Sequence, residues 1–334
     1  ENIIPEGYEP YASTLKEMNE LAKILRAEKT SRGYIDFGID EAKIIQDESG
    51  KAIDIVKRTR GDGENLIEDF MIAANETVAT HINNMDLPFI YRVHDLPSSE
   101  KIEDFKNLIK QMGYHIHTNL SKITPLTMQK VLNELKEKKE FSILSDMLLR
   151  SMKKAVYSTN TIGHFGLALK NYTHFTSPIR RFPDLTVHRL LSTYLFENRI
   201  DMETINFNQK YLVDVATNSS ETEVASAEAE RDVLSMKMAE YMENHIGEKY
   251  QGIISGVTNF GFFVKLENLV EGLVHISTLD GYYNYIPEIL SLVKEDNSKK
   301  YRIGDKVTVV VTAANKENST IDFEVVGGSD GDQK

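Results

Sequence analysis

The 334-residue chain contains no cysteine, and this absence excludes disulfide bridges, thiolate nucleophiles and cysteine-based zinc or iron–sulfur sites. A chain without cysteine fits a reducing compartment, so we expect a cytoplasmic protein. No apolar run approaches the roughly 20 residues that cross a membrane, and the start ENIIPEGYEP lacks the basic and apolar regions of a signal peptide. We therefore expect neither a membrane protein nor a secreted one.

An excess of positive charge is also missing. The chain has 39 Lys and Arg against 51 Asp and Glu, which gives a net charge of −12. Proteins that coat nucleic acid by bulk attraction need clustered Lys and Arg, so a nucleic-acid site in this chain must be a local basic or aromatic feature. The remaining composition, 41% hydrophobic and 27% charged, is typical of a folded globular protein.

The pattern of apolar residues changes near residue 246. Helical periodicity before that point predicts helices at 13–29, 64–83, 99–112, 127–138, 142–154 and 208–244. Short strands are predicted at 34–37, 42–46, 52–56 and 89–93. Residues 252–326 instead show short alternating strands separated by Gly, Asn and Asp turns, typical of a small barrel. We predict an α+β domain at 1–245, an all-β barrel at 246–327 and a disordered tail at 328–334.

The densest cluster of reactive side chains is the run HFTSPIRRFPD at residues 174–184. Its Ser-Pro pair predicts a helix of about one turn, and its Pro-Asp pair predicts a second helix. Two helix N-termini would then lie beside Arg180 and Arg181, an arrangement that attracts phosphate. The alternative is a structural turn whose arginines pair with Asp184 or with other carboxylates.

Two other groups of polar residues permit more than one interpretation. Glu230 lies on a different helix face from Glu228 and Asp232, and a solvated charged face explains this acidic stretch as well as an active centre does. His115 and His117 could hold a metal in a hydrolase, but that hypothesis rests on these two histidines alone.

The barrel region has aromatic residues in the string NFGFFV. Strand alternation puts Phe262 on the opposite face from Phe260 and Phe263, so one set can fill the barrel while the other faces solvent. Exposed aromatics on such barrels stack nucleic-acid bases at about 1 to 3 kcal/mol each. Residues 245–328 carry eight Lys or Arg against eleven Asp or Glu, so stacking should contribute more than charge.

The run at 172–191, together with the HFG string before it, resembles the signature of the ribonuclease II and ribonuclease R (RNB) family. The resemblance implies that Arg180 binds the scissile phosphate and that Arg181 is a weaker candidate for contact with the RNA backbone. Three more strings match in order, namely GYIDF, LIEDFMIAAN and AERD. They imply that Phe37 stacks on bases, that Glu68 contacts the terminal nucleotide and that Glu230 sits at the active centre.

The barrel pattern resembles the OB-fold RNA-binding domain repeated in the largest protein of the small ribosomal subunit. The resemblance implies RNA contacts by His275 and by Phe260 or Phe263. One departure occurs near the end of the fourth strand, where that domain often has Asp and Arg and this chain has Ala314–Asn318.

As a member of this family, the protein would be a processive, magnesium-dependent 3′→5′ exoribonuclease of RNA degradation. It would be a monomer that hydrolyses single-stranded RNA with a free 3′ end to nucleoside 5′-monophosphates. The family holds its metals in an aspartate cluster spaced D-x5-D-x-D-D, which this sequence lacks. We therefore expect a C-terminal fragment that holds no metal by itself and is inactive alone. The alternative is a non-catalytic RNA-binding or scaffold protein derived from the same family.

Overall fold

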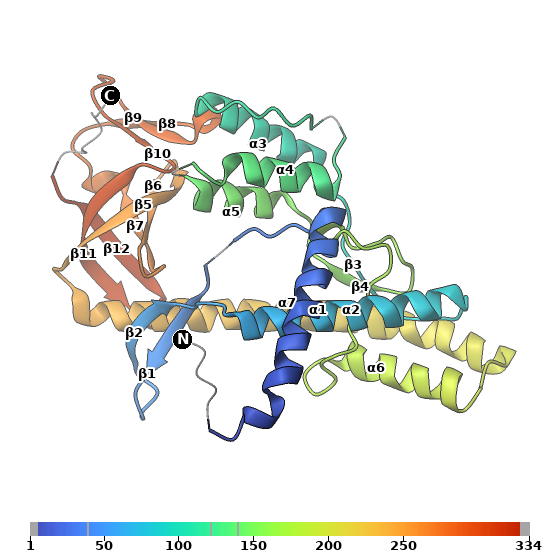
Figure 1. Cartoon of the computed structure of the whole chain (residues 1–334). Helices are drawn as coiled ribbons and strands as arrows, with labels where there is room; N and C mark the ends of the chain where they lie inside the picture. The colour runs from blue at the N-terminus through green and yellow to red at the C-terminus, as the bar shows by residue number, and fades with distance from the viewer. Residues whose placement is uncertain (1–5, 39, 121, 139, 328–334) are drawn as a thin grey trace.

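The computed structural model describes residues 6–38, 40–120, 122–138 and 140–327. A helical body lies at one end of the molecule and a β-barrel at the other, and one long helix runs from the lower end of the barrel across the helical body (Figure 1). The α-helices of the described residues are α1 (Ala12–Arg32), α2 (Asp62–Asn84), α3 (Ser99–Gln111), α4 (Pro125–Leu135), α5 (Phe141–Ser151), α6 (Phe182–Leu191) and α7 (Met202–Met242). None of these helices is both long and apolar enough to cross a bilayer.

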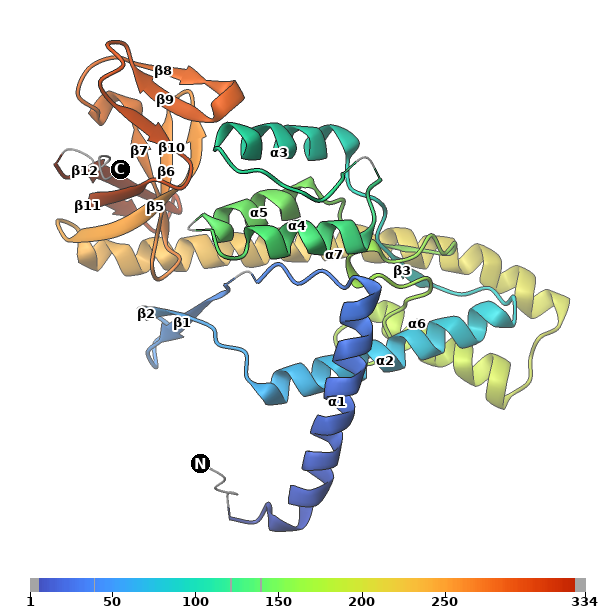
Figure 2. The same cartoon turned by 45° about the horizontal axis from the view of Figure 1, so that its top comes forward.

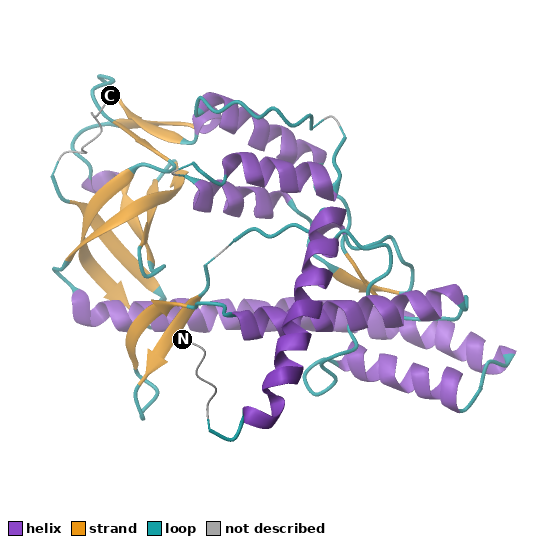
Figure 3. Ribbon diagram, in the orientation of Figure 1, coloured by secondary structure: helices purple, strands orange, loops and turns teal. Residues whose placement is uncertain are grey.

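Within the described residues the strands form four separate sheets (Figure 3). Two are antiparallel pairs: β1 (Ala42–Gln46) with β2 (Ala52–Lys57) near the barrel, and β3 (Tyr91–Val93) with β4 (Val156–Ser158) in the helical body. The closed barrel, in spatial order, is β11 (Lys306–Asn315), β12 (Thr320–Val325), β7 (Glu271–His275), β6 (Gly261–Leu266) and β5 (Lys249–Thr258). A three-stranded sheet of β8 (Tyr283–Ile286), β9 (Ser291–Lys294) and β10 (Lys300–Arg302) is inserted into it. The expected α+β class with a terminal OB-type barrel is confirmed.

Helix α7 links the two ends of the molecule. Near its C-terminus the buried carboxylate of Glu240 accepts hydrogen bonds from the Ala52 amide (3.1 Å), from Lys237 (2.7 Å) and from Lys316. These three partners lie on the β1–β2 hairpin, on α7 and on the β11–β12 turn, respectively. The two lysines hold the pKa of Glu240 at about 2, well below its ordinary value. One carboxylate therefore ties the hairpin and the barrel to the same helix.

Two predicted elements are wrong. Residues 34–37 are an extended loop, because the Ile35 amide bonds to the Gly166 carbonyl (3.0 Å) and no neighbouring strand pairs with them. The predicted one-turn helix after Ser177 is a hydrogen-bonded turn, and α6 begins directly behind it at Phe182. The predicted tail at 328–334 lies outside the described residues.

Candidate functional site

The turn before α6 presents Arg180 to solvent. The amides of Arg180 and Arg181 donate to the Ser177 carbonyl at 3.4 and 3.2 Å, and Pro183 occupies the first turn of α6, where a missing N–H costs nothing. Within the described residues no ion pair or side-chain hydrogen bond involves the exposed Arg180 guanidinium. This guanidinium is thus available to bind an anion at the helix N-terminus.

The neighbouring Arg181 has a different environment. Its Nη1 lies 3.9 Å from Oδ1 of Asp184, a carboxylate with no exposed surface, and the same oxygen accepts the Ser177 amide at 2.7 Å. Burial raises the pKa of Asp184, and its Oδ2 has no hydrogen-bond partner among the described residues. Each arginine therefore fits one of the two interpretations of this run. Arg181 pairs with the Asp184 carboxylate, as in a structural turn. Arg180 has no such partner among the described residues and fits a phosphate site.

A cluster of histidines and tyrosines packs behind this turn. His94, His164, Tyr172, His174 and Tyr157 meet edge to face in that order, with ring centroids 5.1 to 5.7 Å apart. The pKa of His164 is lowered to about 3 and that of His174 to about 2, mainly by burial and in part by the charge of nearby Arg92. The histidines are therefore neutral at physiological pH, and the cluster acts as a rigid support for the turn.

Arg92 and Glu223 form an ion pair beside the cluster, and no sequence pattern predicted it. Arg92 on β3 donates from Nη1 and Nη2 to the two carboxylate oxygens of Glu223 on α7, and the Nη2–Oε1 distance is 3.1 Å. The same guanidinium lies 4.8 Å from the centre of the Tyr157 ring. A double hydrogen bond and a ring contact fix this arginine in place. The two residues are 131 positions apart, so no local pattern could have revealed them.

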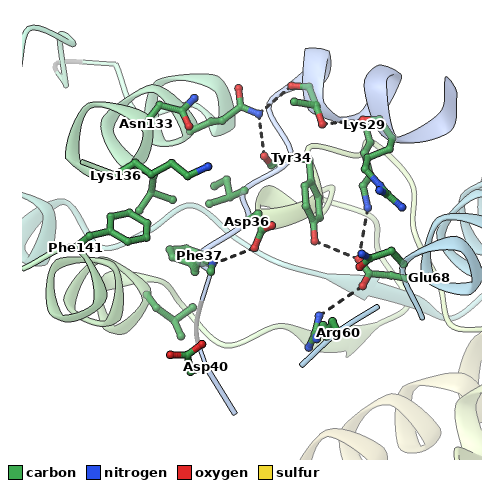
Figure 4. Close-up of a pocket in the computed structure, with 18 of the residues that line it drawn as sticks. Lys29, Tyr34, Asp36, Phe37, Asp40, Arg60, Glu68, Asn133, Lys136 and Phe141 are labelled. Atoms are coloured by element: carbon green, nitrogen blue, oxygen red, sulfur yellow. Dashed lines mark hydrogen bonds and ion pairs between the residues drawn. The ribbon is translucent and has the colours of Figure 1, made fainter. Parts of the chain in front are cut away.

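Phe37 and Glu68 line the same pocket, a cavity of about 920 Å³ between α1, α2, α4 and the loop after α1 (Figure 4). Phe37 is half-buried, and its ring packs on the core formed by α3, α4 and α5. Glu68 comes from the N-terminal half of α2, on the other side of the cavity from α4. The structure thus brings together the two residues expected to hold the 3′ end of an RNA.

Three donors hold the Glu68 carboxylate at the pocket wall. Its Oε1 lies 3.3 Å from Oη of Tyr34 and 3.4 Å from Nζ of Lys29, and its Oε2 lies 3.6 Å from Nη1 of Arg60. Lys29 also pairs with the buried Asp69 at 2.6 Å. These three partners come from α1, from the loop after it and from the residues before α2, and together they fix the orientation of the carboxylate.

One face of α2 connects this pocket with the turn before α6. Asn75 follows Glu68 by seven residues, which places it on the same side of the helix about 10 Å further along. Its amide donates to Oη of Tyr172 (3.0 Å) and accepts from the Phe175 amide (2.9 Å). This buried contact links the helix that carries Glu68 to the segment just before the Arg180 turn.

Glu230 is not joined to these residues. It lies exposed on α7, and within the described ranges no hydrogen bond or ion pair connects it with Arg180, Glu68 or Phe37. Its neighbours Glu228 and Arg231 form a local pair at 3.9 Å. Its expected place at the active centre stays a prediction.

On the barrel, Phe260, Phe263 and His275 gather at one end. The Phe260 and Phe263 rings meet edge to face at 6.3 Å, and Phe260 is 44% exposed while Phe262 is completely buried, as strand alternation predicted. His275 is exposed and pairs in register with Gly261. Gly261 has φ +152°, and a Cβ there would lie 2.2 Å from the Val274 carbonyl oxygen. A glycine is therefore required to bring these aromatics together.

The described residues do not fit a metal centre. No three His, Asp or Glu side chains among them gather closely enough to hold an ion, and this includes the vicinity of His115 and His117. We therefore assign no step of the chemistry to a metal bound by this chain.

Comparison with known proteins identifies two families in the chain. The RNB domain family matches residues 3–197, and the S1 RNA binding domain family matches residues 243–325. Ribonuclease R 1 of Lactococcus lactis is 46% identical over 320 residues, 96% of this chain and 39% of that protein. Ribonuclease R of Thermotoga maritima is 46% identical over 323 residues, 96% of this chain and 45% of that protein.

Among solved structures, RNase R of Mycoplasma genitalium superimposes with a TM-score of 0.89 at 30% identity, both in its apo form and in complex with ribose-methylated single-stranded RNA. The alignment covers 94% of this chain and 50% of that one. The chain thus spans between about two fifths and one half of the length of the relatives it matches.

Proposed function

The chain belongs to the RNB family, as a ribonuclease R-like member with an S1 RNA-binding domain, and from this we propose that it is the RNA-holding part of a 3′→5′ exoribonuclease. The substrate is single-stranded RNA with a free 3′ end, and the products are nucleoside 5′-monophosphates. The observation that carries the proposal is the shared pocket of Phe37 and Glu68, joined along one face of α2 to the turn that presents Arg180.

In the proposed mechanism the 3′ end of the RNA enters this pocket. Phe37 stacks on a base, and Glu68 contacts the terminal nucleotide, held in position by Lys29, Tyr34 and Arg60. Arg180 binds the scissile phosphate, where its free guanidinium stabilises the charge that develops in the transition state. Arg181 keeps the turn folded against Asp184 and is a secondary candidate for backbone contact.

Further along the RNA, the S1 barrel contributes Phe260, Phe263 and His275 as a stacking surface. We propose residues 1–245 and 246–327 as the catalytic part and the barrel. We also propose that Glu230 supports the site, and that its exposed position on α7 leaves it free to meet residues outside this chain.

Hydrolysis in this proposal depends on magnesium, which would activate water and neutralise phosphate charge. Because the described residues do not fit a metal site, we propose that the metal ligands lie outside these 334 residues. The share of the relatives' length that the chain covers supports this division.

The test compares the 334-residue chain with a longer form of the protein that includes the preceding sequence. With 5′-labelled single-stranded RNA and magnesium, the longer form should release nucleoside monophosphates, detected by mass spectrometry, while the short chain binds the RNA and releases none. Release of nucleoside monophosphates by the short chain would show that the metal ligands lie within these 334 residues, contrary to the proposal. Binding without release by both forms would favour the non-catalytic RNA-binding alternative, and absence of binding would refute an RNA-holding role.

A further inference from the structure

The wall of the pocket that contains Glu68 has five cationic side chains, and four of them form ion pairs with carboxylates. Arg58 and Arg60 pair with Glu41 at 3.2 and 2.9 Å. Arg26 pairs with Asp69 at 2.7 Å, and Lys29 pairs with both Glu68 and Asp69. An anion that enters the pocket must compete with these carboxylates for each of the four.

The fifth cation, Lys136, has no ion pair among the described residues. It is exposed at the C-terminal end of α4. Asn133 precedes it by three residues, which places both side chains on one helix face, and Asn133 is exposed as well. In Figure 4 both lie on the α4 wall, across the cavity from Glu68, with the Lys136 ammonium extended towards the Tyr34–Phe37 loop.

This wall is fixed relative to Phe37. Gln129, one turn before Asn133 on α4, donates its side-chain amide to the carbonyls of Thr30 (2.9 Å) and Tyr34 (3.0 Å). Helix α4 is also anchored by four buried apolar side chains. Asn133 and Lys136 therefore keep a constant distance from the loop that carries Phe37, as a binding subsite requires.

The size of the pocket leaves room beyond one nucleotide. Pockets that enclose a single drug-sized molecule commonly measure about 300 to 1,000 Å³. The cavity here, about 920 Å³, is at the upper end of that range. Glu68 and the Tyr34 hydroxyl lie on one side, so a nucleotide held there leaves the α4 wall open to the next one.

We propose that Asn133 and Lys136 form a second nucleotide subsite, in which Lys136 binds an internucleotide phosphate of the RNA near its 3′ end and Asn133 hydrogen-bonds the same nucleotide. The ammonium of a lysine is a compact charge with three donors and suits a phosphate oxygen. This inference rests on the proposed function and adds to it the contacts of a second nucleotide.

The first test measures binding of a 5′-labelled ten-residue oligouridine to the 334-residue chain by fluorescence anisotropy at several salt concentrations. Lys136→Gln should weaken binding about fivefold and lower the slope of log K against log salt by about 0.7, the loss of one phosphate contact on a single strand. The matched control is Lys130→Gln, which removes the same charge from an exposed site of α4 outside the pocket and should change neither quantity. Lys136→Arg should restore the slope.

A second measurement locates the phosphate. A series of oligonucleotides carries one uncharged methylphosphonate linkage each. The wild-type chain should lose affinity at one linkage near the 3′ end, and Lys136→Gln should show no further loss at that linkage, because the two changes remove the same contact. Lys130→Gln should retain the full loss.

The proposed subsite would be wrong if Lys136→Gln and the wild type had the same salt dependence of binding and the same loss of affinity at every methylphosphonate linkage. The variant Phe37→Ala separates this outcome from failure of the proposed function. If Phe37→Ala weakens RNA binding while Lys136→Gln does not, only the second subsite is wrong. If the wild-type chain binds no RNA, both proposals fail together.

Discussion

Two adjacent arginines with unequal surroundings define the chemistry at the scale of single residues. Arg181 lies beside the buried Asp184, whereas Arg180 has no partner among the described side chains and faces solvent. An arginine already paired in the folded state must give up that pair to bind phosphate, while a free one gives up only water. Under the proposed function, we therefore expect Arg180 to bind phosphate and Arg181 to anchor the turn.

We predict that Arg180→Gln in a catalytically active longer form lowers kcat by roughly 10²- to 10³-fold and changes RNA affinity by much less, because the charge it stabilises grows in the transition state. Single-turnover cleavage and equilibrium binding measure the two effects separately. Arg189→Gln, an exposed charge on α6, is the control and should leave both unchanged. Parallel losses of affinity and rate would mean that Arg180 only anchors the RNA.

A second prediction concerns acid stability. His164 and His174, buried near Arg92 and Arg181, have folded-state pKa values of about 3 and 2, whereas both should titrate near 6.5 once unfolded. Their contribution to the free energy of unfolding is complete above pH 6.5. It falls as the pH drops below 6.5 towards 3, by up to roughly 1.4 kcal/mol per pH unit for each histidine, because only the unfolded chain takes up the protons.

Urea titrations between pH 7.5 and 4.5 check this prediction. The unfolding midpoint should be steady above pH 7 and decline below 6.5, before most carboxylates begin to titrate. His174→Gln should lower the stability at pH 7.5 but flatten its decline with pH. If the stability of that variant falls with pH as steeply as that of the wild type, other groups cause the acid sensitivity.

The side chains expected from the sequence were those that sit in recognisable strings, and the structure places Phe37 and Glu68 in one pocket. Their supporting residues were missed. Lys29, Tyr34 and Arg60 approach Glu68 from outside its helix, and Lys136 lies in a separate helix across the cavity. Such contacts depend on how elements pack, which no local pattern records.

At the scale of elements, α7 is supported mainly at its two ends. Its first half packs on β4 and α6, and its last turns pack on the barrel and on the β1–β2 hairpin. From about residue 224 to 235, almost every side chain is exposed within the described structure. The helix persists there because both flanks are anchored, not because its middle is covered. Figure 2 shows the helix running from the barrel to the helical body.

The anchor at Glu240 gives a prediction for this element. Glu240→Ala should lower the free energy of unfolding by about 3 kcal/mol, because it leaves Lys237 and the Ala52 amide without their buried partner. Hydrogen exchange should show faster exchange of the Ala52 amide and of the hairpin around it. Glu228→Ala, exposed on the same helix, is the control and should change stability by less than about 0.5 kcal/mol.

Regular elements were the most predictable part of the fold. The predicted helix at 64–83 is observed at Asp62–Asn84, and the predicted strand at 42–46 is observed without change. The predictions failed where backbone groups form hydrogen bonds with residues that are distant in the sequence. Residues 34–37 were predicted as a strand, but their hydrogen-bond partners are the Gly166 carbonyl and the Gln129 side chain. At Ser177 the turn is completed by Asp184, which bonds the Ser177 amide from within the next helix.

At the scale of the whole molecule, the barrel and the helical body share a hydrophobic core. The barrel residues Phe262 and Phe323 belong to the same buried cluster as Met242 of α7, Ile55 of the hairpin and Ile143 of α5. The sequence predicted a boundary near 245 from the change in pattern. Packing across that boundary makes the barrel a fixed part of the structure and not a tethered module.

This shared core predicts that the chain unfolds in one transition. Phe323→Ala, deep in the barrel, should lower the thermal midpoint followed by the helical signal as well as that followed by tyrosine fluorescence. Its expected cost is about 3 to 5 kcal/mol. Two separate transitions, with only one displaced by the substitution, would show that the barrel unfolds independently.

The uncovered middle of α7 has a consequence for how the protein can vary. Four residues inserted there would shift one anchored end by about 6 Å along the axis and turn it by about 40°. The barrel could then no longer keep both its place on α7 and its contacts with α5, such as the Lys265–Asp146 pair at 3.4 Å. The residue count of this stretch is therefore constrained by contacts made elsewhere in the molecule, whereas its exposed side chains can vary.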